Sequence, residues 1–172
     1  HGVTDADVGS LIDLEKGSIY ETTILEIRKG QRGQPGEMSG MINYNDEYKL
    51  GTVEENTNVG IYGTLTNLPK ELRGVSSIPV TYKEGIKKGK AQIISSVEGK
   101  RREYEIEIEH TNYHSDGNNK GIQFQVTDER LLEDTGGIIQ GMSGSPIVQN
   151  GHVFISDSKM GYGIFIENML EH

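Results

Sequence analysis

Residues 102–109 read Arg-Glu-Tyr-Glu-Ile-Glu-Ile-Glu and carry the clearest strand signal in the chain. Tyr104, Ile106 and Ile108 alternate there with four glutamates. Because successive side chains of a β-strand point to opposite faces, this pattern puts the apolar residues on one face and the carboxylates on the other. The segment therefore predicts a strand of an antiparallel sheet with one buried and one solvated face.

Short segments rich in Val, Ile, Thr and Tyr lie on both sides of this strand, separated by turns that use many of the 23 glycines. We expect strands at residues 18–29, 57–65, 77–82, 90–97, 122–126, 147–148, 153–156 and 162–166, and loops at 30–40 and 113–120. Asp128 to Asp134 is the best helix candidate, with Thr127 or Asp128 as N-cap and Gly136-Gly137 after its end. Together these elements predict an all-β sandwich or barrel.

Composition narrows the class of protein. A length of 172 residues suits one domain, or one domain built of two small barrels. The net charge of −9 argues against a nucleic-acid or anionic-membrane surface. The absence of Cys excludes a thiol nucleophile, a thiolate metal site and a disulfide.

Both ends of the chain look truncated. We find no signal peptide, and no apolar run approaches the roughly 20 residues that a membrane-spanning helix needs. The start at His1 does not resemble a natural one, and Leu170-Glu171-His172 is typical of the beginning of a vector-encoded tag. We therefore place one domain at residues 1–170 and exclude Glu171 and His172.

Gly141-Met142-Ser143-Gly144-Ser145-Pro146 is the most informative motif. A serine nucleophile needs an exposed Oγ and backbone N–H groups that point at the developing oxyanion. Gly141 permits the tight turn that directs those amides, and Gly144 lets a substrate approach the backbone. The motif predicts Ser143 as nucleophile and the N–H groups of Gly141 and Ser143 as oxyanion hole. Ser145 is the competing nucleophile, and a plain Gly/Ser turn fits the same residues.

A serine hydroxyl also needs a general base, usually a histidine that a carboxylate holds in place. His1 lies in the first part of the chain, where peptidases of His-first order carry their base. The other histidines lie at the end of the acidic strand, in a polar turn, after Gly151 and at the end of the chain, and these are His110, His114, His152 and His172.

Four stretches resemble a known family: residues 1–7 (HGVTDAD), 30–36 (GQRGQPG), 136–151 (GGIIQGMSGSPIVQNG) and 161–166 (GYGIFI). They are similar to the peptidase domain of the stage IV sporulation protein B family, which comprises sporulation signalling serine peptidases of endospore-forming bacteria. The resemblance covers nearly the whole chain, and the stretch through Ser143 is its most specific part.

The resemblance implies a chymotrypsin-like double β-barrel with one or two short helices and a triad of His1, Asp128 and Ser143, without metal or cofactor. It favours Ser143 over Ser145 because the family serine precedes Gly-(Gly/Ser)-Pro. Asp128 lies only 15 positions before Ser143, whereas typical chymotrypsin-like enzymes take their aspartate from the first barrel. Asp128 also suits a helix cap. The alternatives for the orienting carboxylate are Asp5, Asp7 and Asp46.

The resemblance also implies self-cleavage and an extracytoplasmic role in the space between the mother-cell and forespore membranes. There such a peptidase cuts a membrane-bound regulator and so releases an intramembrane protease that activates a late sigma factor. Family members carry an upstream membrane anchor and a PDZ module, which this sequence does not include.

One departure from the family lies after the Ser143 loop. In the family, Gln-Asn-Gly is followed by a further strand before His-Val-Phe, whereas here Gly151 runs directly into His152. In chymotrypsin-like enzymes that strand lines the primary specificity pocket. We therefore expect that residues are missing from this sequence between Gly151 and His152.

Two other functions fit the sequence less well. One is a non-catalytic β-barrel interaction module with a relic Gly/Ser loop. The other is a metal-binding domain that uses His110, His114 and Asp116, whose spacing is a weak signal next to that of an exposed polar turn.

Overall fold

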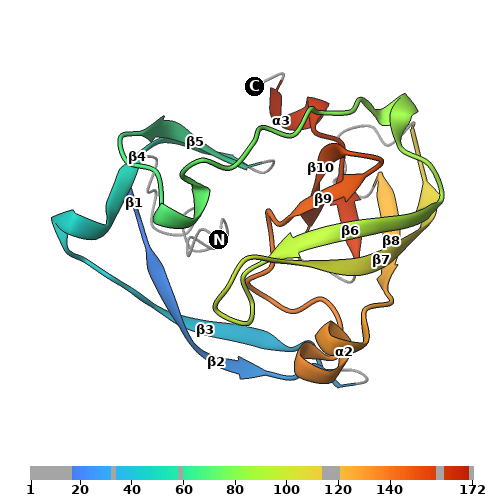
Figure 1. Ribbon diagram of the computed structural model, residues 1–172, viewed down its shortest axis with the longest axis horizontal. Helices are drawn as coiled ribbons and strands as arrows, with labels where there is room; N and C mark the ends of the chain where they lie inside the picture. Colours follow the sequence, from blue (N-terminus) through green and yellow to red (C-terminus); the bar gives the residue numbers. More distant parts are fainter. Residues whose placement is uncertain (1–16, 32–33, 58–59, 114–120, 158–160, 171–172) are drawn as a thin grey trace.

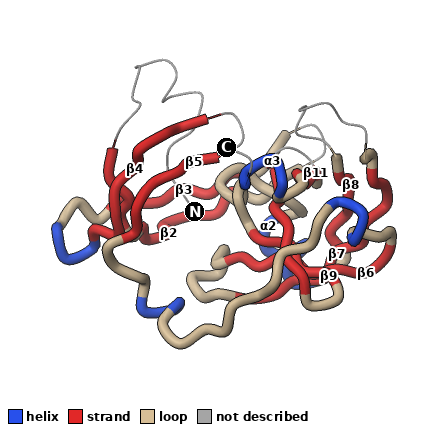
Figure 2. The backbone as a smooth tube through the Cα atoms, turned by 90° about the horizontal axis from the view of Figure 1, so that it is seen from above, coloured by secondary structure: helices blue, strands red, loops and turns tan. Residues whose placement is uncertain are grey.

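The computed structural model describes residues 17–31, 34–57, 60–113, 121–157 and 161–170 (Figure 1). Its strands fall into two groups that lie side by side in both views (Figures 1 and 2). The first group forms two small antiparallel sheets, and the second forms a closed barrel of six strands. This is the all-β, chymotrypsin-like fold that we expected, with an open first half and a closed second half.

The first half holds five strands. One sheet has the order β1-β4-β5, and the other is the hairpin β2-β3; the strands are β1 (Gly17–Tyr20), β2 (Thr22–Arg28), β3 (Glu37–Ile42), β4 (Lys49–Thr57) and β5 (Gly60–Leu65). The single strand expected at 18–29 is wrong, because Glu21 interrupts it. The N–H of Glu21 donates to the carbonyl of Tyr48, and its own carbonyl accepts from Asn43, so the chain passes there from one sheet to the other.

The second half is a closed barrel with the strand order β10-β11-β8-β7-β6-β9, in which β9 pairs with both β6 and β10. Its strands are β6 (Gly89–Ser95), β7 (Arg102–Thr111), β8 (Ile122–Val126), β9 (Pro146–Gln149), β10 (His152–Asp157) and β11 (Tyr162–Ile164). The alternation read from β7 is confirmed, since Tyr104, Ile106 and Ile108 are at most 1% exposed and belong to the core. The intervening glutamates are exposed.

Two α-helices and three 3-10 turns complete the described residues: α2 (Glu129–Thr135), α3 (Glu167–Leu170), η1 (Asp46–Tyr48), η2 (Lys70–Leu72) and η3 (Lys83–Gly85). The predicted helix is confirmed as α2, with Asp128 as N-cap and Gly136 after its end at a φ of 74°. The loop expected at residues 30–40 is confirmed only in part, because β3 begins at Glu37.

The expected strand at 77–82 is wrong. Only Val80 forms an isolated parallel bridge there, to Val153. Pro79 lacks an N–H and therefore cannot donate to a ladder. The segment is nonetheless hydrogen-bonded to the second half of the molecule. The N–H of Val153 donates to the carbonyl of Pro79 at 3.0 Å, and the N–H of Lys83 donates to Glu167 Oε1 at 2.6 Å.

Further along, side chains of the barrel hold the same connecting segment. Gln149 accepts from the N–H of Lys87 at 2.9 Å and donates to the carbonyl of Lys87 at 2.8 Å. The hydroxyl of Tyr113 donates to the carbonyl of Ile86 at 2.9 Å. The connector from Pro79 to β6 thus belongs structurally to the second half.

Asn150 and Gly151 join β9 to β10 in a two-residue turn. Their φ angles of 52° and 78° are those of a type I′ turn, the geometry that Asn-Gly favours in hairpins. The expectation that residues are missing between Gly151 and His152 stays a prediction.

The β2–β3 hairpin contacts the segment that leads from α2 to Ser143. The N–H of Gly30 donates to the carbonyl of Thr135 at 2.8 Å, and that of Gln140 donates to the carbonyl of Gly36 at 2.9 Å. Met38 in turn donates to the carbonyl of Gln140 at 3.0 Å. The first half of the molecule therefore supports the backbone from which the Ser143 loop begins.

Gly36 lies at a tight part of this contact. A Cβ atom there would come within 2.6 Å of the Arg28 carbonyl, the Gly30 nitrogen and Ile139 Cγ2. We expect Gly36→Ala to lower the free energy of unfolding by about 1–3 kcal/mol, the usual cost of overpacking, in a urea titration. Gly17→Ala is the matched control, because its Cβ would meet nothing within 4 Å. Equal urea midpoints for the two variants would contradict this account.

Candidate active site

The Ser143 loop is a tight turn at the start of β9. Gly141 and Gly144 have φ angles of 98° and 77°, which side chains rarely adopt. The loop is closed by the N–H of Met142, which donates to the carbonyl of Ile139 at 3.2 Å, and by that of Ser145, which donates to Met142 at 3.1 Å. The fully buried side chain of Met142 anchors the turn in the core.

The two serines of the loop differ in accessibility. Ser143 is exposed, whereas Ser145 is 1% exposed. The Oγ of Ser145 is buried and has no hydrogen-bond partner among the described residues. A nucleophile must reach a substrate carbonyl, so the accessibility of the two hydroxyls supports Ser143 over Ser145.

The backbone amides of the loop are available for an anion. Neither the N–H of Gly141 nor that of Ser143 donates a hydrogen bond to any residue that the structure describes. Amides that are held by a rigid turn and have no internal acceptor can stabilise an oxyanion without reorganisation. The oxyanion hole expected from the sequence at these two amides stays a prediction.

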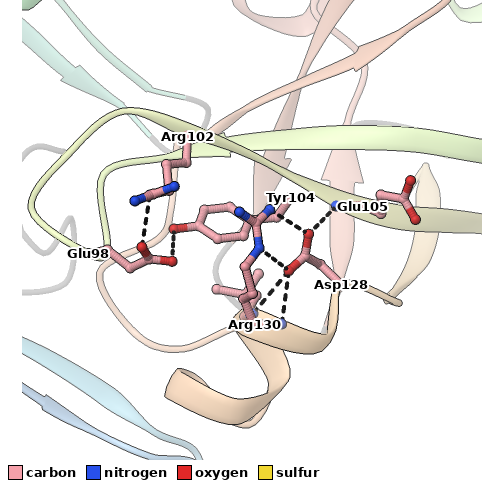
Figure 3. Close-up of polar contacts among 7 residues, drawn as sticks. Glu98, Arg102, Tyr104, Glu105, Asp128 and Arg130 are labelled. Atoms are coloured by element: carbon pink, nitrogen blue, oxygen red, sulfur yellow. Dashed lines mark hydrogen bonds and ion pairs between the residues drawn. The ribbon is translucent and has the colours of Figure 1, made fainter.

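Asp128 caps α2 and is 9% exposed. Its Oδ1 accepts from the backbone N–H groups of Arg130 at 3.0 Å and Leu131 at 3.2 Å. Its Oδ2 accepts from the N–H of Glu105 at 3.3 Å and from Nη2 of Arg130 at 3.1 Å (Figure 3). The carboxylate thus binds three backbone amides and one guanidinium, which identifies a structural role in joining α2 to β7.

These contacts decide the charge state of Asp128. Burial on its own would raise the pKa of the carboxyl, but the hydrogen bond from Arg130 and those from the amides of Leu131 and Glu105 outweigh burial and hold the pKa below its usual range. The same ion pair raises the pKa of Arg130. Asp128 is therefore a carboxylate throughout the neutral range.

Arg130 connects Asp128 to a second ion pair. Its guanidinium lies 5.7 Å from the ring centroid of Tyr104. The Tyr104 hydroxyl donates to Glu98 Oε1 at 2.9 Å, and Arg102 Nε lies 2.8 Å from Glu98 Oε2 (Figure 3). Burial, together with Glu98, raises the pKa of Tyr104.

This chain of contacts ties the β6–β7 turn to the start of α2. Sequence reasoning missed it, although the opposite charges of Glu98 and Arg102 and the Asp-Glu-Arg at residues 128–130 were visible in the sequence.

The other predicted site residues divide into two groups. The candidate base His1 lies outside the described residues, as do Asp5, Asp7, His114, Asp116 and His172. Asp46 and His110 are exposed on η1 and β7, and His152 is exposed with Nδ1 3.1 Å from the carbonyl of Asn150. Of the predicted triad the structure describes Asp128 and Ser143, and these two share no hydrogen bond.

The described residues include neither a cluster suited to a metal ion nor a helix suited to span a membrane. No group of three or more His, Cys, Asp or Glu side chains in the described ranges is arranged to hold a metal ion. No described helix is both long and apolar enough to cross a membrane.

The fold defines the class, a chymotrypsin-like β protein, in which the exposed Ser143 lies between two glycines of positive φ. The family model described as SpoIVB peptidase S55 matches residues 1–170. The chain therefore belongs to the SpoIVB peptidase S55 family, a family of peptidases. No curated protein matches the chain. No solved structure matches it either.

The Asp128 contacts lead to a prediction for stability. In Asp128→Asn an amide N–H₂ replaces one acceptor oxygen and faces a backbone donor, so we expect the free energy of unfolding at pH 7 to fall by about 1–3 kcal/mol. The native pKa of Asp128 is lowered, so the stability from its charge is present above the unfolded pKa near 4 and is lost as pH falls through the native value. The difference between wild type and variant should therefore shrink on acidification.

Urea titrations at several pH values between about 7 and 3 measure this difference. Asp134→Asn is the matched control, since Asp134 is an exposed carboxylate of the same helix, and its replacement should change stability by less than about 0.5 kcal/mol. A wild-type advantage over Asp128→Asn that stays constant with pH would show that the charge of Asp128 does not contribute.

Proposed function

We propose that the protein is a serine endopeptidase with Ser143 as its nucleophile. The observation that carries this proposal is the exposed Ser143 between two positive-φ glycines, with the amides of Gly141 and Ser143 free of acceptors among the described residues. Membership of the SpoIVB peptidase S55 family supports peptide bonds as the target.

In the proposed mechanism His1 is the general base. It accepts the hydroxyl proton of Ser143 while Oγ attacks the carbonyl carbon of the scissile peptide bond. The amides of Gly141 and Ser143 bind the oxygen of the tetrahedral intermediate. His1 then gives the proton to the leaving amine, the C–N bond breaks, and water hydrolyses the acyl-enzyme by the same route in reverse. No step needs a metal or a cofactor.

Asp128 orients His1 and stabilises its charged form in this proposal. The lowered pKa of Asp128 supports the role, because the orienting group must be ionised when the imidazolium forms. The Asp128 carboxylate also binds Arg130 and the α2 amides. An experiment can therefore distinguish an orienting role from a capping role. An orienting role predicts that Asp128→Asn loses activity at temperatures where the variant is still folded, whereas a capping role predicts activity in proportion to the folded fraction.

The proposal extends to the biological role. We propose that the peptidase cleaves itself and cuts a membrane-bound regulator of an intramembrane protease, which leads to activation of a late sigma factor during sporulation. The proposed compartment is the extracytoplasmic space between the forespore and mother-cell membranes. The family membership supports a sporulation peptidase, and the net charge of −9 favours protein substrates over nucleic acid.

Ser143→Ala tests the nucleophile. We expect a loss of about three orders of magnitude or more in peptide hydrolysis, because the other catalytic groups have no covalent partner without the hydroxyl. Self-cleavage on denaturing gels and labelling by a fluorophosphonate probe should be lost together with hydrolysis.

Ser145→Ala is the matched control for this prediction. It removes a buried hydroxyl that has no partner among the described residues, so its effect on stability should be small and probe labelling should persist. Undiminished activity in Ser143→Ala would exclude Ser143 as nucleophile. A wild-type protein without hydrolysis or labelling would favour the alternative, a non-catalytic barrel that binds a partner.

A further inference from the structure

The β6–β7 turn lies at the same end of the barrel as the Ser143 loop. In β6 and β9, Ile93 pairs with Ile147, and in β6 and β7, Ser95 pairs with Arg102. Continuing the β6–β9 register by two residues brings Ser95 opposite Ser145, and both serines are buried. The turn of residues 96–101, which follows β6, and the Ser143 loop, which precedes β9, therefore lie at the same end of this antiparallel pair.

This turn is basic in an acidic protein. It contains Lys100 and Arg101 and is followed by Arg102, whereas the whole chain has a net charge of −9. Arg102 is already paired with Glu98, and Arg130 is paired with Asp128. Lys100 and Arg101 are exposed and form no ion pair with any described residue. Two exposed cations without an ion-pair partner among the described residues thus lie at the same end of the barrel as the proposed nucleophile.

The turn is also held in one conformation. The N–H of Gly99 donates to the carbonyl of Ser96 at 2.8 Å, and Gly99 has a φ of 77°. Val97 is 1% exposed and belongs to the core, and Glu98 is fixed by Tyr104 and Arg102. A recognition element that is ordered before binding loses little conformational entropy on contact with a ligand.

We propose that the 96–101 turn is a substrate-recognition element in which Lys100 and Arg101 bind carboxylates of the substrate close to the scissile bond. The substrate class is a peptide segment with Asp or Glu near the cleaved bond. This inference rests on the proposed serine endopeptidase function. Two exposed cations beside a fixed backbone would also raise the encounter rate with acidic segments, and salt would screen that effect.

The experiment uses a library of peptides derived from a proteome, with cleaved bonds identified by mass spectrometry. We expect the wild-type protein to favour Asp and Glu near cleaved bonds by about threefold over their frequency in the library, as contacts between exposed charges allow. In Lys100→Gln/Arg101→Gln this preference should disappear. In Lys100→Glu/Arg101→Glu, Lys and Arg should become favoured instead.

Lys87→Gln/Lys88→Gln is the matched control, because it removes two exposed positive charges at the opposite end of β6 and should keep the acidic preference. A wild-type protein that cleaves the library without acidic preference, or a preference that survives in both turn variants, would overturn the recognition proposal alone. A wild-type protein that neither cleaves the library nor reacts with a fluorophosphonate would overturn the proposed function, and the recognition proposal with it.

Discussion

Pairing between β6 and β9 fixes the position of the Ser143 loop in this molecule. The pairs Gln92–Val148 and Ile93–Ile147 close the barrel, and closure removes the free strand edges that the hairpins would otherwise expose. The Ser143 loop enters β9 directly, so the same pairing fixes the loop at one end of the barrel. The β2–β3 hairpin then supports the loop from the other side through backbone hydrogen bonds to Gln140 and Thr135.

The parts of the fold that were predictable are those in which one local pattern dominates. β7 has alternating apolar residues, and α2 has a capping aspartate and a terminal glycine, so both were found from the sequence. β3 and β4 were missed because Gly40 and Gly51 interrupt any alternation and their pairing comes from distant partners. The break at Glu21 depends on Tyr48 and Asn43, which lie more than 20 residues away, and no local signal records it.

The candidate site also has features that the local sequence predicted and features that it could not predict. The glycines at 141 and 144 predict a tight turn around Ser143, and both have positive φ in the structure. The accessibility of Ser143 and the burial of Ser145 depend on the packing of Met142 and were not readable from the sequence. Asp128 satisfied two sequence criteria at once, for a cap and for a triad member. The cap is present, and it extends through Arg130 and Tyr104 to Glu98 in a way that only tertiary contacts could reveal.

The connector that begins at Pro79 shows which part of the chain should unfold together with the barrel. Its backbone is bound by Val153, Glu167, Gln149 and Tyr113, all of which belong to the second half. Cooperative unfolding units follow such hydrogen bonds rather than the midpoint of a linker. The boundary between the two halves in amide hydrogen exchange should therefore fall before Pro79, and the connector from there to β6 should exchange together with the barrel.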